Sequence, residues 1–281
     1  MPKSSVTTEE RQRAIEILLL WEGRVSRGRL LELFDVHGTV LSRDIAAYRE
    51  AFPDVSAVVG AGRAYIAQPW MRPYLTIGRF EEYLQLIGAA GREAVSAGVQ
   101  MLSSGVEIAS IRHPLFSVIH NAIREGKSVR LTYRSLKNPK PHERIIRPHS
   151  LIHAGPRWHV RGYCKEDESY RDFNLGRIAS ATPDQTRLPG EEEDTDWNTF
   201  VDTRLRPHRD LDELQSRLVR DEYMLGAVQL VLKTRIAMIP YTIHAYRAAV
   251  DPDKQTTPEH ILMLCEAGKL PEGLLLRNDD P

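Results

Sequence analysis

Apolar residues recur at helical spacing in three stretches at the start of the chain. We expect Thr7 or Thr8 to cap the first helix and Gly23 to end it, and Ser26 to cap the second. Gly38 then forms a break, because glycine adopts a left-handed turn without a steric penalty. The apolar residues predicted to face inward on the first two helices are Ala14, Ile15, Ile17, Leu18, Trp21, Leu30, Leu31, Leu33 and Phe34.

The third helix has the most regular pattern. We expect Thr39 to cap it and Pro53 to end it, with apolar residues at i, i+4, i+7 and i+11 forming one buried stripe. The stripe is Leu41, Ile45, Tyr48 and Phe52, and the residues left outside are Ser42, Arg43, Ala46, Arg49 and Glu50. Two alternating runs, residues 55–59 and 63–66, then predict a hairpin with a glycine-rich tip. Three helices followed by a hairpin is the order of a winged helix-turn-helix.

The remaining chain alternates between helical and strand patterns. Residues 76–124 are helical in spacing, with Pro114 suited to the first turn of a final helix and Gly126 closing it. Short alternating strands follow to about Thr182, and the run Glu191 to Asp194 is interpreted as a solvated linker. Beyond it we expect a strand over 200–205, a helix through Leu211, Leu214, Leu218 and Tyr223, a strand over 228–232 and a helix over 236–250. The whole predicts an α+β multidomain chain.

Basic residues concentrate in the strand-rich stretch. The 281-residue chain is formally neutral, with 38 Lys and Arg against 38 Asp and Glu. From Lys127 to Arg177, however, twelve Lys or Arg stand against five Asp or Glu, a net charge of +7 before four histidines are considered. Short strands this rich in arginine favour a small β module that holds something anionic.

Cysteine use and the amino-terminal residues narrow the class of protein. Cys164 and Cys265 are the only two cysteines, so we expect neither a disulfide framework nor a thiolate zinc site, and a cytoplasmic location is predicted. From the polar start we expect no signal segment, and the apolar run from Ile17 to Trp21 is too short to span a bilayer. The histidines lack i, i+4 pairing, so no metal is expected, nor any cofactor.

The β module allows catalysis or binding. Acid–base or nucleophilic groups are available from His142, His149, His153, His159, Tyr163 and Cys164. The strands that bear the central histidines contain no Asp or Glu to orient a catalytic imidazole, and Cys164 is in strand phase with Trp158 and Val160, as a buried core residue would be. Binding accounts better for the arginines, because guanidinium groups grip phosphate or carboxylate oxygens bidentately. We therefore expect a binding protein and not an enzyme.

The amino-terminal segment is a candidate for DNA binding. A recognition helix places its first residues against base edges while flanking groups hold phosphates. Residues 1–67 contain nine basic and nine acidic side chains, so the order of elements carries this hypothesis more than charge does. The predicted DNA-binding residues are Arg27, Arg29, Thr39, Ser42, Arg43, Arg49 and Arg63.

A ligand pocket is predicted in the β module. Arg157, His159, Arg161 and Tyr163 share one strand face, and Tyr133 or His159 is suited to stacking on a base. About half of the arginines are expected to pair with acidic residues elsewhere in the chain. The predicted ligand-binding residues are Tyr133, Ser150, Arg157, His159, Arg171 and Arg177.

Several motifs in this module resemble the WYL domain, a small Sm-like β-barrel. They are Tyr133-Arg134, Arg147-Pro148-His149-Ser150-Leu151, Arg157-Trp158-His159-Val160 and Phe173-Asn174-Leu175-Gly176-Arg177-Ile178. Trp158-His159-Val160 stands where Trp-Tyr-Leu is usual for the family. The tail resembles the C-terminal extension of WYL regulators, in Leu205-Arg206-Pro207-His208, Leu211-Asp212-Glu213-Leu214-Gln215 and Arg220-Asp221-Glu222-Tyr223. Together these features look most like the WYL repressors encoded beside phage-defence operons of the BREX and CBASS kinds.

The resemblance implies four parts: a winged helix-turn-helix DNA-binding domain (1–70), a helical linker (71–125), a ligand-sensing WYL domain (126–185) and an α/β C-terminal dimerisation domain (195–281). It implies a homodimeric repressor that binds a palindromic double-stranded DNA operator, without a membrane. Release is expected when the WYL domain binds an anionic ligand, a nucleic acid or nucleotide. Two alternatives stay open: an RNA- or nucleotide-binding adaptor or enzyme that uses the Sm-like module, and a DNA-damage-responsive activator.

Overall fold

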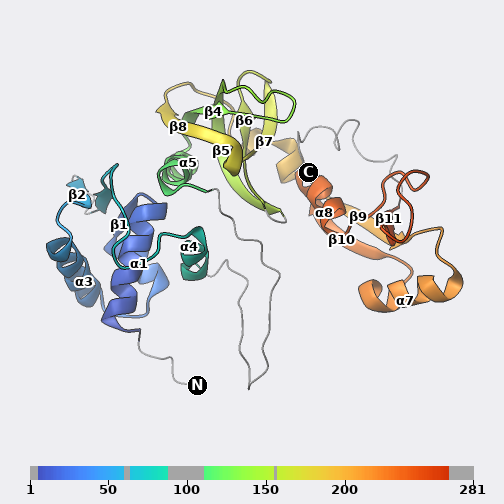
Figure 1. Cartoon of the computed structure of the whole chain (residues 1–281), viewed down its shortest axis with the longest axis horizontal. Helices are drawn as coiled ribbons and strands as arrows, with labels where there is room; N and C mark the ends of the chain where they lie inside the picture. Colours follow the sequence, from blue (N-terminus) through green and yellow to red (C-terminus); the bar gives the residue numbers. More distant parts are fainter. Residues whose placement is uncertain (1–5, 60–63, 88–110, 155–156, 266–281) are drawn as a thin grey trace. The chain divides into compact units, whose positions relative to one another are not determined.

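The computed structural model describes residues 6–59, 64–87, 111–154 and 157–265 (Figure 1). The chain divides into two compact units, one made of residues 1–130 and 180–185 and the other of residues 131–179 and 186–281. Helices and sheets occur in both, as expected for an α+β chain. No helix within the described ranges is long and apolar enough to cross a membrane.

The first helix forms where its sequence signals place it. Thr7 caps α1 (Thr8–Trp21), and reciprocal hydrogen bonds between Thr7 and Glu10 complete a capping box. Gly23 follows with a φ of 69°, a left-handed conformation that glycine adopts without strain. All five apolar residues predicted to face inward on this helix are buried. The helix therefore forms the centre of the amino-terminal core.

The second helix is short and only partly buried. Ser26 caps α2 (Arg27–Leu33), and its hydroxyl accepts the N–H of Arg29, as the sequence predicts. Leu30 is fully buried, but Leu31 is 46% exposed, so the prediction that Leu31 faces inward is wrong. A helix of two turns offers one narrow inward face, and neighbouring positions on it point about 100° apart.

The third helix starts earlier than predicted. In α3 (Gly38–Ala51) the N-cap is His37, whose Nδ1 accepts the N–H of Thr39. Gly38 is the first helical residue and not a left-handed break, so both the predicted break and the predicted Thr39 cap are wrong. The stripe is confirmed at Leu41, Ile45 and Tyr48, which are buried.

A three-stranded sheet completes this part. The predicted hairpin is formed by β2 (Ser56–Val59) and β3 (Ala64–Ala67), which pair antiparallel. A further strand, β1 (Arg24–Ser26), pairs with β3, so the order is β1-β3-β2. Three residues between two helices carry too little pattern to be recognised as a strand. Helices followed by this sheet confirm the winged helix-turn-helix arrangement.

Buried polar groups join the elements of this unit. On α1, the carboxylate of Glu16 is fully buried and accepts the backbone N–H groups of residues 74, 75 and 76 at 2.8–3.1 Å. The hydroxyls of Tyr48 and Thr76 also donate to it, at 2.9 and 2.8 Å. Arg11 pairs with Asp44 of α3 at 2.7 Å between Nε and Oδ2. These bonds hold α3 and the segment after the wing against α1.

Two further helices lie beside α1. They are α4 (Phe80–Leu86) and α5 (His113–Glu125), and residues 88–110 of the predicted helical stretch lie outside the described part. Pro114 stands in the first turn of α5 and Gly126 ends it with a φ of 62°, both as predicted. The indole of Trp21 contacts the rings of Phe80, Tyr83, His113 and Phe116.

The middle of the chain forms a five-stranded sheet of order β7-β6-β5-β4-β8. Its strands are β4 (Ser128–Tyr133), β5 (His142–Ala154), β6 (Arg157–Cys164), β7 (Ser169–Asn174) and β8 (Ile178–Asp184), with the 3-10 turn η1 (Leu175–Arg177) before β8. Val160 and Cys164 are fully buried on one face of β6. The prediction that Cys164 is a core residue is confirmed, and burial raises the pKa of its thiol to about 12.

The C-terminal part has its own antiparallel sheet, of order β10-β9-β11. Its core contains Leu205, Val219, Ile239 and Leu262. The predicted helix over 236–250 is shorter, and the third strand was not predicted. The elements are η2 (Glu191–Glu193), α6 (Thr195–Asn198), β9 (Phe200–Pro207), α7 (Glu213–Met224), β10 (Leu230–Arg235), η3 (Ile236–Met238), α8 (Ile239–Ala245) and β11 (Leu262–Leu264).

Candidate functional site

The outer face of α3 presents polar side chains near its start. Thr39, Ser42 and Arg43 are all exposed, while Asp44 on the opposite side is buried against Arg11. Ser42 donates its hydroxyl to the carbonyl of Gly38 at 3.0 Å. Within the described residues Arg43 has no ion-pair partner. An exposed guanidinium and two exposed hydroxyl-bearing side chains therefore lie on one side of the first two turns.

Arg29 is engaged inside the protein. Its Nη2 lies 2.7 Å from Oε1 of Glu22, and its Nη1 lies 2.8 Å from Oε2 of Glu32. The hydrogen bond that Arg29 donates to Glu22 is the main reason that the pKa of Arg29 is raised. Tyr83 of α4 donates to the same Glu22 carboxylate at 3.4 Å. Arg29 therefore joins α2 to the buried end of α1, a role that its surface-like sequence context did not indicate.

The other predicted DNA contacts occupy different environments. Arg27 is exposed at the start of α2. Arg49 lies with its guanidinium carbon 4.6 Å from the ring centroid of Tyr65, so α3 and strand β3 are joined by a cation–π contact. Arg63, at the predicted tip of the wing, lies outside the described residues.

Both faces of β6 are buried, and they differ in chemistry. Val160 and Cys164 face the apolar core, while His159 and Arg161, on the other face, are only 3% and 4% exposed. A guanidinium can be taken out of water only when carboxylates or other acceptors replace its hydration. The second face must therefore be covered by polar groups.

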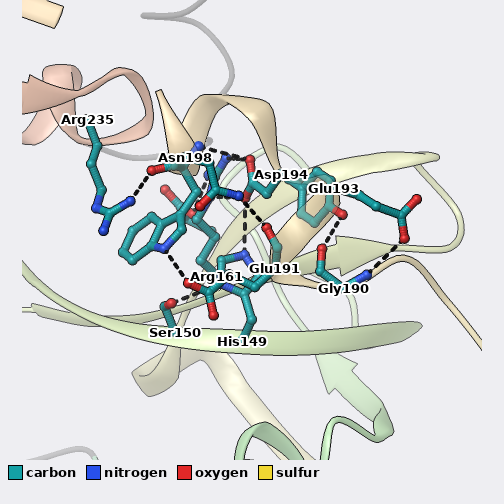
Figure 2. A network of polar contacts seen from close by, with 12 residues as sticks. His149, Ser150, Arg161, Gly190, Glu191, Glu193, Asp194, Asn198 and Arg235 are labelled. Carbon is teal, nitrogen blue, oxygen red and sulfur yellow. Dashed lines mark hydrogen bonds and ion pairs between the residues drawn. The ribbon is translucent and has the colours of Figure 1, made fainter. Parts of the chain in front are cut away.

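Two carboxylates supply that cover, Asp172 and Asp194, and Figure 2 shows Asp194 beside Arg161. Arg161 Nη1 donates to Asp172 Oδ1 at 2.9 Å, from the position directly opposite on β7. Its Nε and Nη2 donate to the two oxygens of Asp194 at 2.7 and 3.0 Å, a bidentate pair. Asp194 comes from the segment after η2 and is 1% exposed. The interpretation of Glu191 to Asp194 as a solvated linker is therefore wrong at its last residue.

A β-bulge turns His149 toward the same carboxylate. The register of β5 against β6 shifts between Pro148 and Ser150, which leaves His149 as the extra residue. Its Nε2 lies 3.1 Å from Asp194 Oδ2, and its Nδ1 lies 2.8 Å from Ser150 Oγ. Asp194 also accepts the N–H of Trp197 and so caps α6. One carboxylate thus joins two strands of the sheet to the first helix of the C-terminal part.

The charges in this cluster reinforce one another. Burial alone raises the pKa of Asp194, but hydrogen bonds from His149 and Arg161 outweigh it and lower the pKa to about 2. For Arg161, burial lowers the pKa, yet Asp172 and Asp194 together raise it above its ordinary value. Both partners are therefore held in their charged forms.

The C-terminal domain contributes a second contact to this face. Tyr241 of α8 donates its hydroxyl to Asp172 Oδ2 at 2.9 Å, and burial followed by the Asp172 charge raises its pKa. Its ring lies 5.4 Å from the imidazole of His159 between centroids. Arg235 of β10 stacks over the Trp197 indole at 4.7 Å. We call Arg161, Asp172, Asp194, His149 and Tyr241 the Arg161 cluster.

The structure brings some of the six predicted pocket residues to this face and not others. By strand register, Ser150, Arg157 and His159 lie on the Arg161 side of the sheet. Arg171 is opposite Gly162 and so belongs to the other side, where its Nε lies 3.7 Å from Asp167.

Tyr133 and Arg177 have other surroundings. The Tyr133 ring packs edge-on against Phe173, and its hydroxyl accepts the N–H of Asn174 at 3.4 Å. Arg177 lies in the η1 turn, and its carbonyl accepts the N–H of Arg134. The prediction missed His149, Asp172 and Asp194. Asp194 lies 33 residues from Arg161, and no local pattern connects the two.

Three successive segments of the chain match known families. Residues 7–89 match the winged helix-turn-helix domain of the BrxR transcriptional regulator, and residues 114–183 match the WYL domain. Residues 200–269 match the C-terminal dimerization domain of the BrxR transcriptional regulator.

Relatives of known function match most of the chain. The DNA-binding transcriptional repressor CapW of Escherichia coli (strain KTE188) is 30% identical over 246 residues, which cover 84% of this chain and 81% of the relative. CapW of Pseudomonas aeruginosa is 28% identical and also covers 84% and 81%. Among solved structures, Proteasome accessory factor B/C of Arthrobacter aurescens is 18% identical with a TM-score of 0.26. It covers 97% of this chain, which spans about half (48%) of that longer chain.

The order of domains, a winged helix followed by a WYL domain and a dimerisation domain, agrees with the fold described above. The similarity to CapW covers 84% of the chain. The chain therefore belongs to the family of WYL-domain DNA-binding transcriptional repressors that includes CapW.

Proposed function

We propose that this chain works as a homodimeric repressor of a phage-defence operon and binds a palindromic operator. In this proposal residues 1–70 are the DNA-binding domain, and the protein acts as a regulator and not as an enzyme. The observation that carries it is the exposed start of α3, because Thr39, Ser42 and Arg43 face outward on a helix whose other side is fixed by Asp44 and Tyr48.

In the proposed complex α3 enters the major groove. Arg43 and Ser42 contact base edges, and Arg27 contacts phosphate, while Arg29 and Arg49 hold α2 and β3 in place through Glu22 and Tyr65. Two copies related by a two-fold axis place their α3 helices in successive major grooves, roughly 34 Å apart. This spacing accounts for the expected palindrome.

Arg43→Ala tests whether α3 is the recognition helix. Loss of an arginine contact to a base edge costs roughly 1–3 kcal/mol, so we expect about 10- to 100-fold weaker binding to the chain's own promoter DNA at fixed salt. Arg187→Ala is the matched control, because Arg187 is also an exposed arginine but lies outside the winged helix. A gel-shift titration against promoter and scrambled duplexes measures both. Equal operator affinity of the Arg43 variant and the wild type contradicts the assignment of α3.

The Arg161 cluster supplies a route for release. An anionic ligand with two oxygens, such as a phosphate group of a nucleotide or single-stranded nucleic acid, can replace the Asp194 carboxylate on Arg161 and His149. This exchange frees Asp194 and, with it, the cap of α6. The ligand must favour the exchanged form, because equal affinity for both forms shifts neither population. Ser150, which contacts His149, and His159, which contacts Tyr241, then line the opened face.

Histidine variants test this route. His149→Gln removes the imidazole on Asp194, whereas His153→Gln alters an exposed histidine on the same strand that stacks on Trp158. We expect both to bind operator duplex as the wild type does. Short single-stranded DNA or a mononucleotide should release the wild type and the His153 variant from operator duplex at the same ligand concentration. The His149 variant should need a different ligand concentration for release. Identical release curves for all three proteins exclude the proposed exchange.

A further inference from the structure

The C-terminal domain carries leucines on its outer surface. Helix α7 buries Val219 and Met224 on its inner side, each 5% exposed. On its outer side Leu214 is 78% and Leu218 is 66% exposed, one helical turn apart. The spacing of apolar residues that predicted this helix therefore describes two faces, and only one of them is covered within the described part of the chain.

The turn after α7 carries two more exposed apolar side chains. Leu225 is 98% exposed, and Val228, two residues after Gly226, is 72% exposed. Leu225 also has a φ of 50°, a left-handed conformation that is unfavourable for a leucine and ordinary for glycine or asparagine. The turn is held by the N–H of Gly226, which donates to the carbonyl of Arg220 at 3.0 Å. A large apolar side chain in a strained position, with almost all of its surface in water, stabilises nothing inside this domain.

We propose that Leu214, Leu218, Leu225 and Val228, the α7 leucine surface, form the contact through which two copies of the chain associate. This inference rests on the homodimer of the proposed function and names the surface that makes it. The partner is a second copy because the surface lies within residues 200–269, which match a dimerization domain. A two-fold contact buries the same patch from both copies, so each leucine counts twice.

Charge on the helix is compatible with self-association. Between Glu213 and Met224, α7 carries Arg217 and Arg220 against Glu213, Asp221 and Glu222, a net charge of −1. Two such helices face each other with little net repulsion, and charges of both signs are available at the rim of the contact. An acidic or basic partner of another kind would be matched better by a surface of one sign.

Charged substitutions test the surface in the full-length chain. We expect Leu214→Glu/Leu218→Glu to raise the dimer dissociation constant by about 100-fold or more, measured by sedimentation velocity over a concentration series. Leu136→Glu is the matched control, because Leu136 is 71% exposed but lies in the middle domain, and its dissociation constant should equal that of the wild type. Far-ultraviolet circular dichroism should be the same for all three proteins.

Leu225→Gly separates an interface role from a structural one. Glycine relieves the left-handed strain, so at concentrations where both proteins are monomeric the variant should melt at the wild-type temperature or above it. Its dimer dissociation constant should nevertheless rise by about tenfold, because an apolar side chain is lost from the contact. A rise in melting temperature with an unchanged dissociation constant overturns the proposal.

Other outcomes distinguish failure of the homodimer proposal from failure of the α7 leucine surface. A wild-type protein that remains monomeric at every concentration overturns the homodimer itself. A dimeric wild type whose double glutamate variant dimerises equally well overturns only the α7 leucine surface. A lower melting temperature of that variant with an unchanged dissociation constant means that the leucines pack within their own chain.

Discussion

Glu16 in the first unit and Asp194 in the second are buried carboxylates that join elements far apart in sequence, and they have different partners. Glu16 accepts three backbone N–H groups and two hydroxyls, all of them neutral donors. Asp194 accepts from the guanidinium of Arg161 and the imidazole of His149, as well as from one backbone N–H. Both side chains are at most 1% exposed.

The difference concerns what can replace the carboxylate. Donors on Glu16 belong to the backbone of residues 74–76, which a free anion reaches only if the amino-terminal unit unfolds locally. Arg161 and His149 are side chains on a sheet face that the Asp194 segment covers, and in the proposed exchange a phosphate group takes the place of the Asp194 carboxylate. Glu16 is therefore suited to a permanent contact between elements, which we call the permanent joint. Asp194 is suited to a contact that a ligand can replace, the exchangeable joint.

Removing the cation is the largest expected perturbation. Arg161→Met leaves Asp172 and Asp194 buried without their shared partner, and we expect a loss of about 3–5 kcal/mol in the free energy of unfolding of the second unit. Chemical denaturation followed by fluorescence measures it. Arg161→Met combined with Asp172→Asn and Asp194→Asn should be less destabilised than the single variant, because the charge imbalance is gone. A triple variant that is less stable than the single one contradicts this explanation.

Neutralising Glu16 should have the second-largest effect on stability. Glu16→Gln turns an amide N–H₂ toward groups that are themselves donors, so we expect a loss of about 3 kcal/mol in the first unit. Glu9→Gln, an exposed substitution on the same helix, should change stability by less than about 0.5 kcal/mol. Differential scanning calorimetry separates the two units if they melt independently. Unchanged stability of the Glu16 variant would falsify the role of this carboxylate as a joint.

Acid should weaken the contacts of Asp194 over a defined pH range. The pKa of Asp194 is lowered from 3.8 to about 2 in the folded chain, so its stabilising contribution is complete above about pH 4 and is lost as pH falls toward 2. That contribution is about 2 kcal/mol. Denaturation curves of the wild type and Asp194→Asn should differ at pH 5 and converge near pH 2. A constant difference at every pH would show that the carboxylate charge is not responsible.

Removing one neutral hydrogen-bond donor should have the smallest effect on stability. Tyr48→Phe removes one hydroxyl from Glu16 and leaves four donors in place, so we expect a loss of about 1 kcal/mol. Ser150→Ala is its counterpart beside Asp194, since it removes only the hydroxyl on His149. Both variants should keep wild-type affinity for operator duplex. The Ser150 variant alone should change the ligand concentration needed for release, which a gel shift measures.

Local signals in the sequence determined the amino-terminal elements well. Thr7 with Glu10 and Ser26 mark helix starts, Gly23 and Gly126 mark helix ends, and the spacing of Leu41, Ile45 and Tyr48 predicts the buried stripe of α3. Such signals act over four residues or fewer, so they depend little on contacts with distant parts of the chain. The misplaced Thr39 cap shows their limit, because His37 offers an acceptor of similar reach.

The candidate site was only partly predictable. Exposure of Ser42 and Arg43 follows from helical spacing alone, and the face shared by His159 and Arg161 follows from strand alternation. Arg161 was recognised as a member of that face but not as its buried centre. Leu214 and Leu218 were recognised as helix-forming, while their outward orientation was not.

What the sequence determined by itself was therefore the kind and order of most described elements, but not strands β1 and β11, together with the strongly basic β module and the resemblance to WYL regulators. Only the tertiary structure decided that Asp194 lies buried against Arg161, that a bulge turns His149 onto it, and that Arg171 lies on the opposite side of the sheet. The physical reason is the separation in sequence over which each interaction acts. Capping and periodicity depend on neighbours in sequence, whereas the cost of burying a charge is offset by whichever opposite charge the fold brings near.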